Sequence, residues 1–240
     1  MSAGTLLLYA IGLNLYALLL IYLRSWIYRA PVYRPMVKNF VLSALPLLIL
    51  VVVLTVFVAA SGLGARPVAI VVAVVGFVTW LLMLPNSGYL ITELNLNHRR
   101  DHESVPLWYD IIAVLTFAMS GVVNTVLGVL AAQLVFTLAI YGDSNTALRS
   151  APVQSVPVVL VALVSVGIYL GRYLRLNSWD VRSPRRMYGK VRDHFDSRSA
   201  WANFLLFCLT HTVFLLLIYG LIAGPLLDAV ANSPDLVVED

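Results

Sequence analysis

Six long apolar segments, separated by shorter polar stretches, dominate the hydrophobic pattern of this chain. The hydrocarbon core of a bilayer is ~30 Å thick and requires ~20 apolar residues in a helix that crosses it. Because an open sheet cannot satisfy its edges in lipid, runs of this length predict helices even where valine is abundant. We therefore expect an all-α, polytopic bundle that forms a single domain over residues 1–240. The expected spans cover residues 4–23, 40–60, 67–84, 107–140, 156–173 and 201–227.

The fourth apolar segment is longer than a membrane requires. It runs from Leu107 to Tyr141, and its roughly 35 residues at 1.5 Å each make a straight helix of roughly 50 Å. Such a helix must tilt, bend or protrude from the bilayer. Gly121, Asn124 and Gly128 mark the expected bend and offer small and polar side chains for close packing. The alternative is a re-entrant hairpin broken near Gly121.

The composition places the whole chain in lipid. Hydrophobic residues make up 60% of the sequence and charged residues 12%, and the mean hydropathy is +0.88. Charged residues make up about a quarter of an average soluble domain. Next to membrane spans, a net charge of +4 indicates orientation and contact with anionic lipid rather than nucleic-acid binding. The expected partners are therefore the bilayer and anionic headgroups at its cytoplasmic face.

The basic residues lie almost entirely on one side of a six-span arrangement. Fourteen of the sixteen Lys and Arg residues fall in the stretches 24–39, 85–106 and 172–200. Cytoplasmic loops are enriched in Lys and Arg, so this asymmetry predicts a cytoplasmic location for the three stretches and an extracytoplasmic one for both termini. A hairpin near Gly121 would place the largest basic cluster, residues 172–200, outside the cell.

This largest cluster contains a candidate amphipathic helix. Ser183 and Pro184 are typical of an N-cap and a first helical position. Met187, Val191 and Phe195 then recur every fourth residue among basic side chains. We expect residues 184–198 to form a short helix lying on the membrane surface. The alternative is a solvated, charged loop.

Three polar motifs fall on the predicted cytoplasmic face. They read PNSGYLITE from Pro85 to Glu93, VPLWYD ending at Asp110, and GRYLRLNSWD from Gly171 to Asp180. Together they resemble a family of bacterial membrane proteins known as domain of unknown function 1361, over roughly residues 70–182. One departure is Glu93, where the family pattern has Asp. The resemblance implies a plasma-membrane protein of bacterial origin and brings no known activity.

These motifs supply the candidate site. Charges close to hydrocarbon must be paired or functional, and three carboxylates and two arginines at one depth exceed what membrane anchoring needs. We expect Asp110 and Glu93 to lie near Arg172, Arg175 or Asp180. The candidate site residues are Asn86, Tyr89, Glu93, Asp110, Arg172, Arg175, Asn177 and Asp180.

Each motif also has a purely structural interpretation. Asp110 lies in the first turn of a helix, where a carboxylate complements the macrodipole. Glu93 could simply be a solvated residue. Arg172 and Arg175 could extend to lipid phosphates, and Asn177, Ser178 and Asp180 could close a helix and form a turn.

Bound metal is a weaker hypothesis. Glu93, Asp110 and Asp180 carry the oxygen ligands that a divalent cation prefers. His98 and His102 lie four residues apart, but in a charged loop without the HExxH order of a zinc enzyme. The sequence leaves the cofactor open.

Three functions remain compatible with these features. The first is a binding or accessory membrane protein whose polar cluster docks a lipid headgroup or a partner. The second is an enzyme that acts on a phosphate-containing, lipid-linked substrate through carboxylate and divalent-cation chemistry. The third is a small transporter, which ranks last because the chain has no internal repeat and few polar residues in mid-membrane.

Overall fold

The computed structural model describes residues 2–95, 104–142, 144–174 and 184–232 of the chain. The described residues form helices and no strand, which confirms the all-α fold. Within this described part of the chain, six segments are long and apolar enough to cross a membrane. The long helices are α1 (Ala3–Tyr28), α2 (Arg34–Gly62), α3 (Arg66–Met83), α5 (Leu107–Tyr141), α6 (Ala151–Tyr173) and α8 (Arg198–Ala231). The short elements are α4 (Pro85–Gly88), α7 (Pro184–His194) and the 3₁₀ helices η1 (Tyr89–Asn95) and η2 (Asn145–Arg149).

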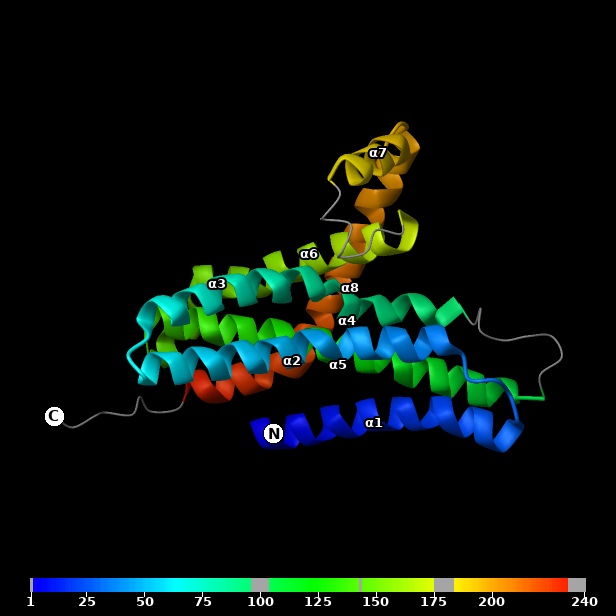
Figure 1. The fold of residues 1–240 in the computed structure, drawn as a ribbon, viewed down its shortest axis with the longest axis horizontal. Coiled ribbons are helices and arrows are strands. Elements are labelled where there is room, and N and C mark those ends of the chain that lie inside the picture. Colours follow the sequence, from blue (N-terminus) through cyan, green and yellow to red (C-terminus); the bar gives the residue numbers. More distant parts are fainter. Residues whose placement is uncertain (1, 96–103, 143, 175–183, 233–240) are drawn as a thin grey trace.

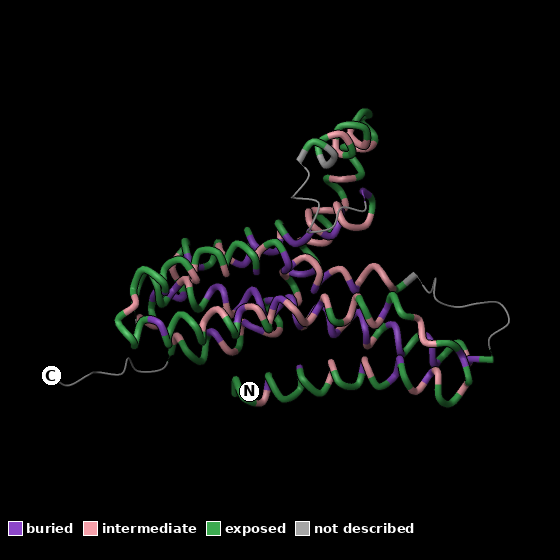
Figure 2. The backbone as a smooth tube through the Cα atoms, in the orientation of Figure 1, coloured by how far each residue is buried: buried purple, intermediate pink, exposed green. Residues whose placement is uncertain are grey.

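Helix α5 is the centre of the bundle. It packs against α1, α2, α4, α6 and α8, and its buried residues extend over most of its length (Figures 1 and 2). The helix is continuous, so the hairpin alternative is wrong. In Figure 1 the α1–α2 connection and the start of α5 lie at one end of the bundle, and the α2–α3 turn lies at the other. This is the alternation that six consecutive spans require.

Helices α6 and α8 form a pair that departs from the other spans. They pack along one another, and in Figure 1 their paired ends rise away from α1 and carry α7 at the tip. The expected helix over residues 184–198 is present but ends earlier, at His194. The next helix begins at Arg198 because the Ser197 hydroxyl caps it by accepting a hydrogen bond from the Ala200 N–H, at 3.2 Å.

The third span changes direction at the Pro-Asn-Ser-Gly motif. Helix α3 ends at Met83, and the chain continues through α4 and η1. A Cβ atom at Gly121 would meet the carbonyl oxygen of Ser87, and one at Gly167 would meet the ring of Pro85. Two glycines, one on α5 and one on α6, therefore allow the motif to lie directly against both helices.

Hydrogen bonds between polar side chains connect the helices around α5. Asn14 and Asn124 exchange amide hydrogen bonds of 2.9 and 3.0 Å, and Asn124 also donates to the Ser43 hydroxyl at 3.1 Å. The Ser87 hydroxyl donates to the carbonyl oxygen of Ser43 at 2.7 Å. These bonds connect α1, α5, α2 and α4. Hydrogen bonds of this kind hold membrane helices together, because lipid provides no hydrophobic drive for their association.

Candidate functional site

The carboxylate of Asp110 is paired with an arginine of the first helix. The Arg24 Nε donates to Asp110 Oδ1 at 2.8 Å, and the two side chains are 8% and 0% exposed. Asp110 lies in the first turn of α5, and Arg24 lies near the end of α1. The sequence predicted that the first span ends at residue 23 and placed Arg24 in the basic stretch 24–39, but the helix does not end there. The first helix continues to Tyr28 and buries its arginine against Asp110.

Aromatic contacts close the surroundings of this ion pair. The Tyr109 hydroxyl donates to the carbonyl oxygen of Leu20 at 2.8 Å. The ring of Tyr28 meets the ring of Tyr109 edge-on, with centroids 5.2 Å apart. Val105 of the VPLWYD motif is buried in the same cluster. The motif therefore packs the start of α5 against the end of α1, and the Asp110 carboxylate is not exposed to solvent.

The expected proximity of Asp110 and Glu93 to the basic residues after the fifth span is not observed among the described residues. Arg172 is half-buried in the last turn of α6, and no ion pair joins it to Asp110 or Glu93 in the described part of the chain. Arg175, Asn177 and Asp180 lie outside the described residues. The prediction for Asp110 named only partners after the fifth span, whereas its observed partner, Arg24, lies on the first.

The remaining candidates make separate, local contacts. Glu93, half-buried in η1, accepts a hydrogen bond at 2.9 Å from the Asn39 amide of α2. The Asn86 amide donates to the carbonyl oxygen of Met83 at 2.9 Å and so closes the end of α3. Tyr89 packs against the main hydrophobic core. These contacts hold the Pro-Asn-Ser-Gly segment in place.

The described residues also contain no group of three His, Cys, Asp or Glu side chains able to hold a metal ion. Glu93 and Asp110 are each engaged by another side chain of the protein. The metal-binding hypothesis also included Asp180. This residue lies outside the described residues, as do His98 and His102.

A groove lies instead where α6, α7 and α8 meet. Its volume is about 670 Å³, and its walls include Tyr169 and Tyr173 of α6, His194 of α7, and Asn203 and Phe207 of α8. The Tyr169 hydroxyl and the His194 Nε2 share a hydrogen bond of 2.8 Å, whose direction depends on the histidine tautomer. This bond connects the end of α7 to α6 and holds an imidazole in the wall of the groove.

Aromatic packing fixes the walls of the groove. Tyr169 meets Phe204 and Phe207 edge-on, with centroid separations of 5.0 and 5.3 Å. Phe195, expected on the membrane-facing side of the amphipathic helix, packs on Trp201 with centroids 4.3 Å apart. The groove is therefore formed by side chains already packed together.

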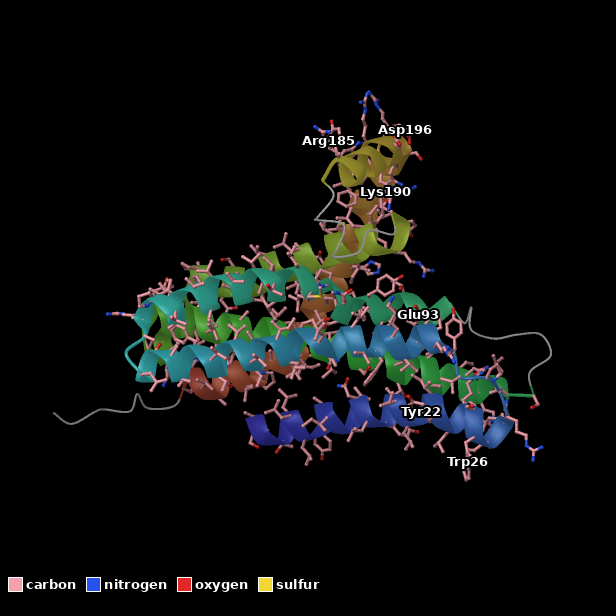
Figure 3. The ribbon with its side chains drawn as sticks, viewed as in Figure 1. Tyr22, Trp26, Glu93, Arg185, Lys190 and Asp196 are labelled. Atoms are coloured by element: carbon pink, nitrogen blue, oxygen red, sulfur yellow. The ribbon has the colours of Figure 1, made fainter. Side chains whose placement is uncertain are left out.

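Exposed charges lie on α7, one of the three helices that form the groove, and on the residues that follow it. Arg185, Lys190 and Arg192 of α7 are exposed, and so are Asp193 and Asp196. Figure 3 shows Arg185, Lys190 and Asp196 at the tip of the molecule formed by α7, and Glu93 at the end of η1. Residues 184–199 hold five Lys or Arg and two Asp, which is a net charge of +3. The tip is thus positive despite its two acids.

The sequence reasoning missed the groove residues. The spacing of Tyr169 and Tyr173, and of Asn203 and Phe207, places each pair on one face of a helix, which is a visible signal. The two faces contact each other only because of the way α6 and α8 pack, and residue spacing does not predict that packing.

Comparison with known proteins supplies a family. A family model described as protein of unknown function (DUF1361) matches residues 38–218. No curated protein and no solved structure matches the chain.

Proposed function

The chain belongs to the DUF1361 family of unknown function, and we propose from its own geometry that it is a membrane-embedded binding protein that docks anionic lipid headgroups at its cytoplasmic face. The docking surface is the basic tip, which consists of α7 and the adjoining start of α8, residues 184–199. The observation that carries the proposal is the set of exposed cations on this tip, Arg185, Lys190 and Arg192.

The location of these cations supports lipid docking. Helix α7, which carries them, lies beside the ends of two candidate spans, α6 and α8 (Figure 1), a position that suits contact with headgroups. Trp201, in the first turns of α8, is exposed, and tryptophan is enriched at the membrane interface. Each Lys or Arg near an anionic surface adds roughly 1 kcal/mol to the attraction in general.

The buried ion pair of α1 and α5 differs from the exposed cations of α7, and this difference supports docking at α7. The guanidinium of Arg24 and the carboxylate of Asp110 neutralise each other in a buried position, so neither attracts a headgroup. The cations of α7 are exposed and lie at the opposite side of the bundle from α1 (Figures 1 and 3). The proposed docking surface is therefore the tip rather than the cluster expected around Asp110.

The enzymatic alternative relied on Glu93, Asp110 or Asp180 to hold a cation or act as a base, and Asp180 lies outside the described residues. Asp110 is engaged by Arg24, and Glu93 by Asn39. Lipid docking needs neither residue, and we therefore favour it.

The proposal is tested by thermal unfolding in nanodiscs with increasing fractions of phosphatidylglycerol in phosphatidylcholine. The triple variant Arg185→Gln, Lys190→Gln, Arg192→Gln should lose most of the rise in the unfolding midpoint that phosphatidylglycerol gives the wild type. The matched control, Arg29→Gln, Arg34→Gln, Lys38→Gln, removes three exposed cations from the α1–α2 connection and the start of α2. It should retain the rise. Equal losses in both variants would refute docking at α7.

A further inference from the structure

We propose that the groove between α6, α7 and α8 holds one anionic phospholipid of the surrounding bilayer, with its phosphate between His194 and Asn203 and an acyl chain along Leu206 and Thr210. This inference rests on the proposed function and deepens it. The proposed function is a general attraction of anionic lipid to the basic tip, and the groove adds a specific site for one lipid molecule.

The direction of the groove suits a lipid. The α8 residues that line it include Ser199, Asn203, Phe207 and Thr210, which recur at helical spacing and form one stripe. Ser199 and Thr210 lie eleven positions apart, so the groove follows α8 for roughly 16 Å at 1.5 Å per residue. It runs from the tip towards the middle of the span. A molecule that follows it has one end near the membrane surface and the other in hydrocarbon.

The upper end of the groove offers hydrogen-bond donors. The amide of Asn203 is exposed and makes no hydrogen bond within the described residues. His194 uses Nε2 for its bond with Tyr169 and makes none through Nδ1 in the same part of the chain. When the Tyr169 hydroxyl donates to Nε2, the proton of the neutral ring is on Nδ1, which then donates. Both groups match a phosphate, whose oxygens only accept.

The lower end is apolar. Leu206 is 62% exposed and Phe207 is half-buried. Thr210 contributes no free donor, because its hydroxyl already donates to the carbonyl oxygens of Leu206 and Phe207 within α8, at 2.8 and 3.0 Å. An acyl chain along Leu206 and Thr210 therefore meets carbon atoms and a hydroxyl that is already hydrogen-bonded.

The charge of the basic tip favours an anionic head. Residues 184–199 include five Lys or Arg and two Asp in sequence, a net charge of +3. A zwitterionic head brings its own cation into this positive field, whereas an anionic head brings none. The site should therefore prefer phosphatidylglycerol to phosphatidylcholine.

Two adjacent leucines give a matched test. Leu206 lines the groove, whereas Leu205, 61% exposed on the same turn of α8, does not. Native mass spectrometry of the full chain in a non-ionic detergent, titrated with phosphatidylglycerol, counts the bound lipids. Wild type and Leu205→Trp should each retain one tightly bound lipid. Leu206→Trp should lose it, because the indole fills the chain end of the groove.

A second variant keeps the test decisive if Leu206→Trp unfolds. Asn203→Leu removes the head contact at an exposed position and should weaken phosphatidylglycerol binding about tenfold, the loss expected for a hydrogen bond to a charged group. Soluble glycerol 3-phosphate, which lacks acyl chains, should not displace the lipid.

The outcomes separate this site from the proposed function. Wild-type binding in both Leu206→Trp and Asn203→Leu, with a loss in the α7 triple variant, would overturn the groove and leave docking at α7 intact. Equal binding of phosphatidylglycerol and phosphatidylcholine in every variant would overturn both.

Discussion

Arg24 and Asp110 face each other across the interface between the end of α1 and the start of α5, with Nε and Oδ1 2.8 Å apart and the carboxylate fully buried. Removing two charges from water is costly, and the cost is offset only while both partners are present. Burial of the pair explains why the first helix extends five residues beyond its apolar segment, which ends at residue 23. The pair stabilises the position of α1 against the bundle.

Removing one partner of this ion pair should lower the free energy of unfolding by more than the loss of an ordinary hydrogen bond does. Asp110→Ala leaves the Arg24 guanidinium without its carboxylate in a buried position, and we expect a loss of about 3–5 kcal/mol, which is typical of such a change. The exchange Arg24→Asp with Asp110→Arg should recover part of the loss. Reversible unfolding in detergent measures both effects.

Glu93→Gln is the control for that measurement. Its partner, the Asn39 amide, is neutral and half-buried, so the loss should be only about 1 kcal/mol. Equal losses for Asp110→Ala and Glu93→Gln would contradict a special role for the buried pair.

The close approach of the Pro-Asn-Ser-Gly segment depends on glycine. Gly167→Leu should disrupt the contact of α6 with Pro85 and lower stability by at least the ~1–3 kcal/mol typical of overpacking. Gly220→Leu is the matched control, because a side chain at Gly220 on α8 meets open space in the protein. The unfolding midpoints of the two variants should therefore differ clearly, and similar midpoints would show that α6 and α4 are not in contact.

The reciprocal amide pair of Asn14 and Asn124 should couple α1 to α5. Double-mutant cycles in a membrane protein give on average about 0.6 kcal/mol per interhelical hydrogen bond, so two bonds predict a coupling of roughly 1 kcal/mol. The cycle uses Asn14→Leu, Asn124→Leu and the double variant. Additive losses would mean that the two amides act independently.

The orientation in the membrane follows from the charges and is open to a direct test. Reporter fusions at Ser144, in the α5–α6 connection, and at Ser197, just before α8, should give opposite signals. Ser197 should report the cytoplasm. Equal signals at the two positions would be incompatible with six alternating spans.

The fold was predictable because length and apolarity alone select a membrane helix. The spans expected at residues 4–23 and 201–227 both lie inside helices, α1 and α8. The pairing of the polar residues was not predictable in the same way. An arginine followed by Trp26 and Tyr28 is typical of an interfacial loop, and only the position of Asp110 across the helix interface shows that Arg24 is buried.

The groove escaped prediction for a related reason. Its residues come from three helices, and neither Tyr169 nor Asn203 is unusual for the helix that carries it. What distinguishes them is the angle at which α6 and α8 diverge from the bundle and hold α7 (Figure 1). That angle is a property of packing and not of periodicity.

The central claim is that the basic tip recruits anionic lipid, and lipid co-purification measures this directly. The protein is reconstituted in vesicles of known phosphatidylglycerol fraction and extracted mildly, and the phosphatidylglycerol and phosphatidylcholine that remain bound are counted for each protein molecule. We predict that wild type carries phosphatidylglycerol in clear excess over its fraction in the vesicles, and that the variant lacking the cations of Arg185, Lys190 and Arg192 does not. Bound lipid that mirrors the vesicle composition in both proteins would contradict the account.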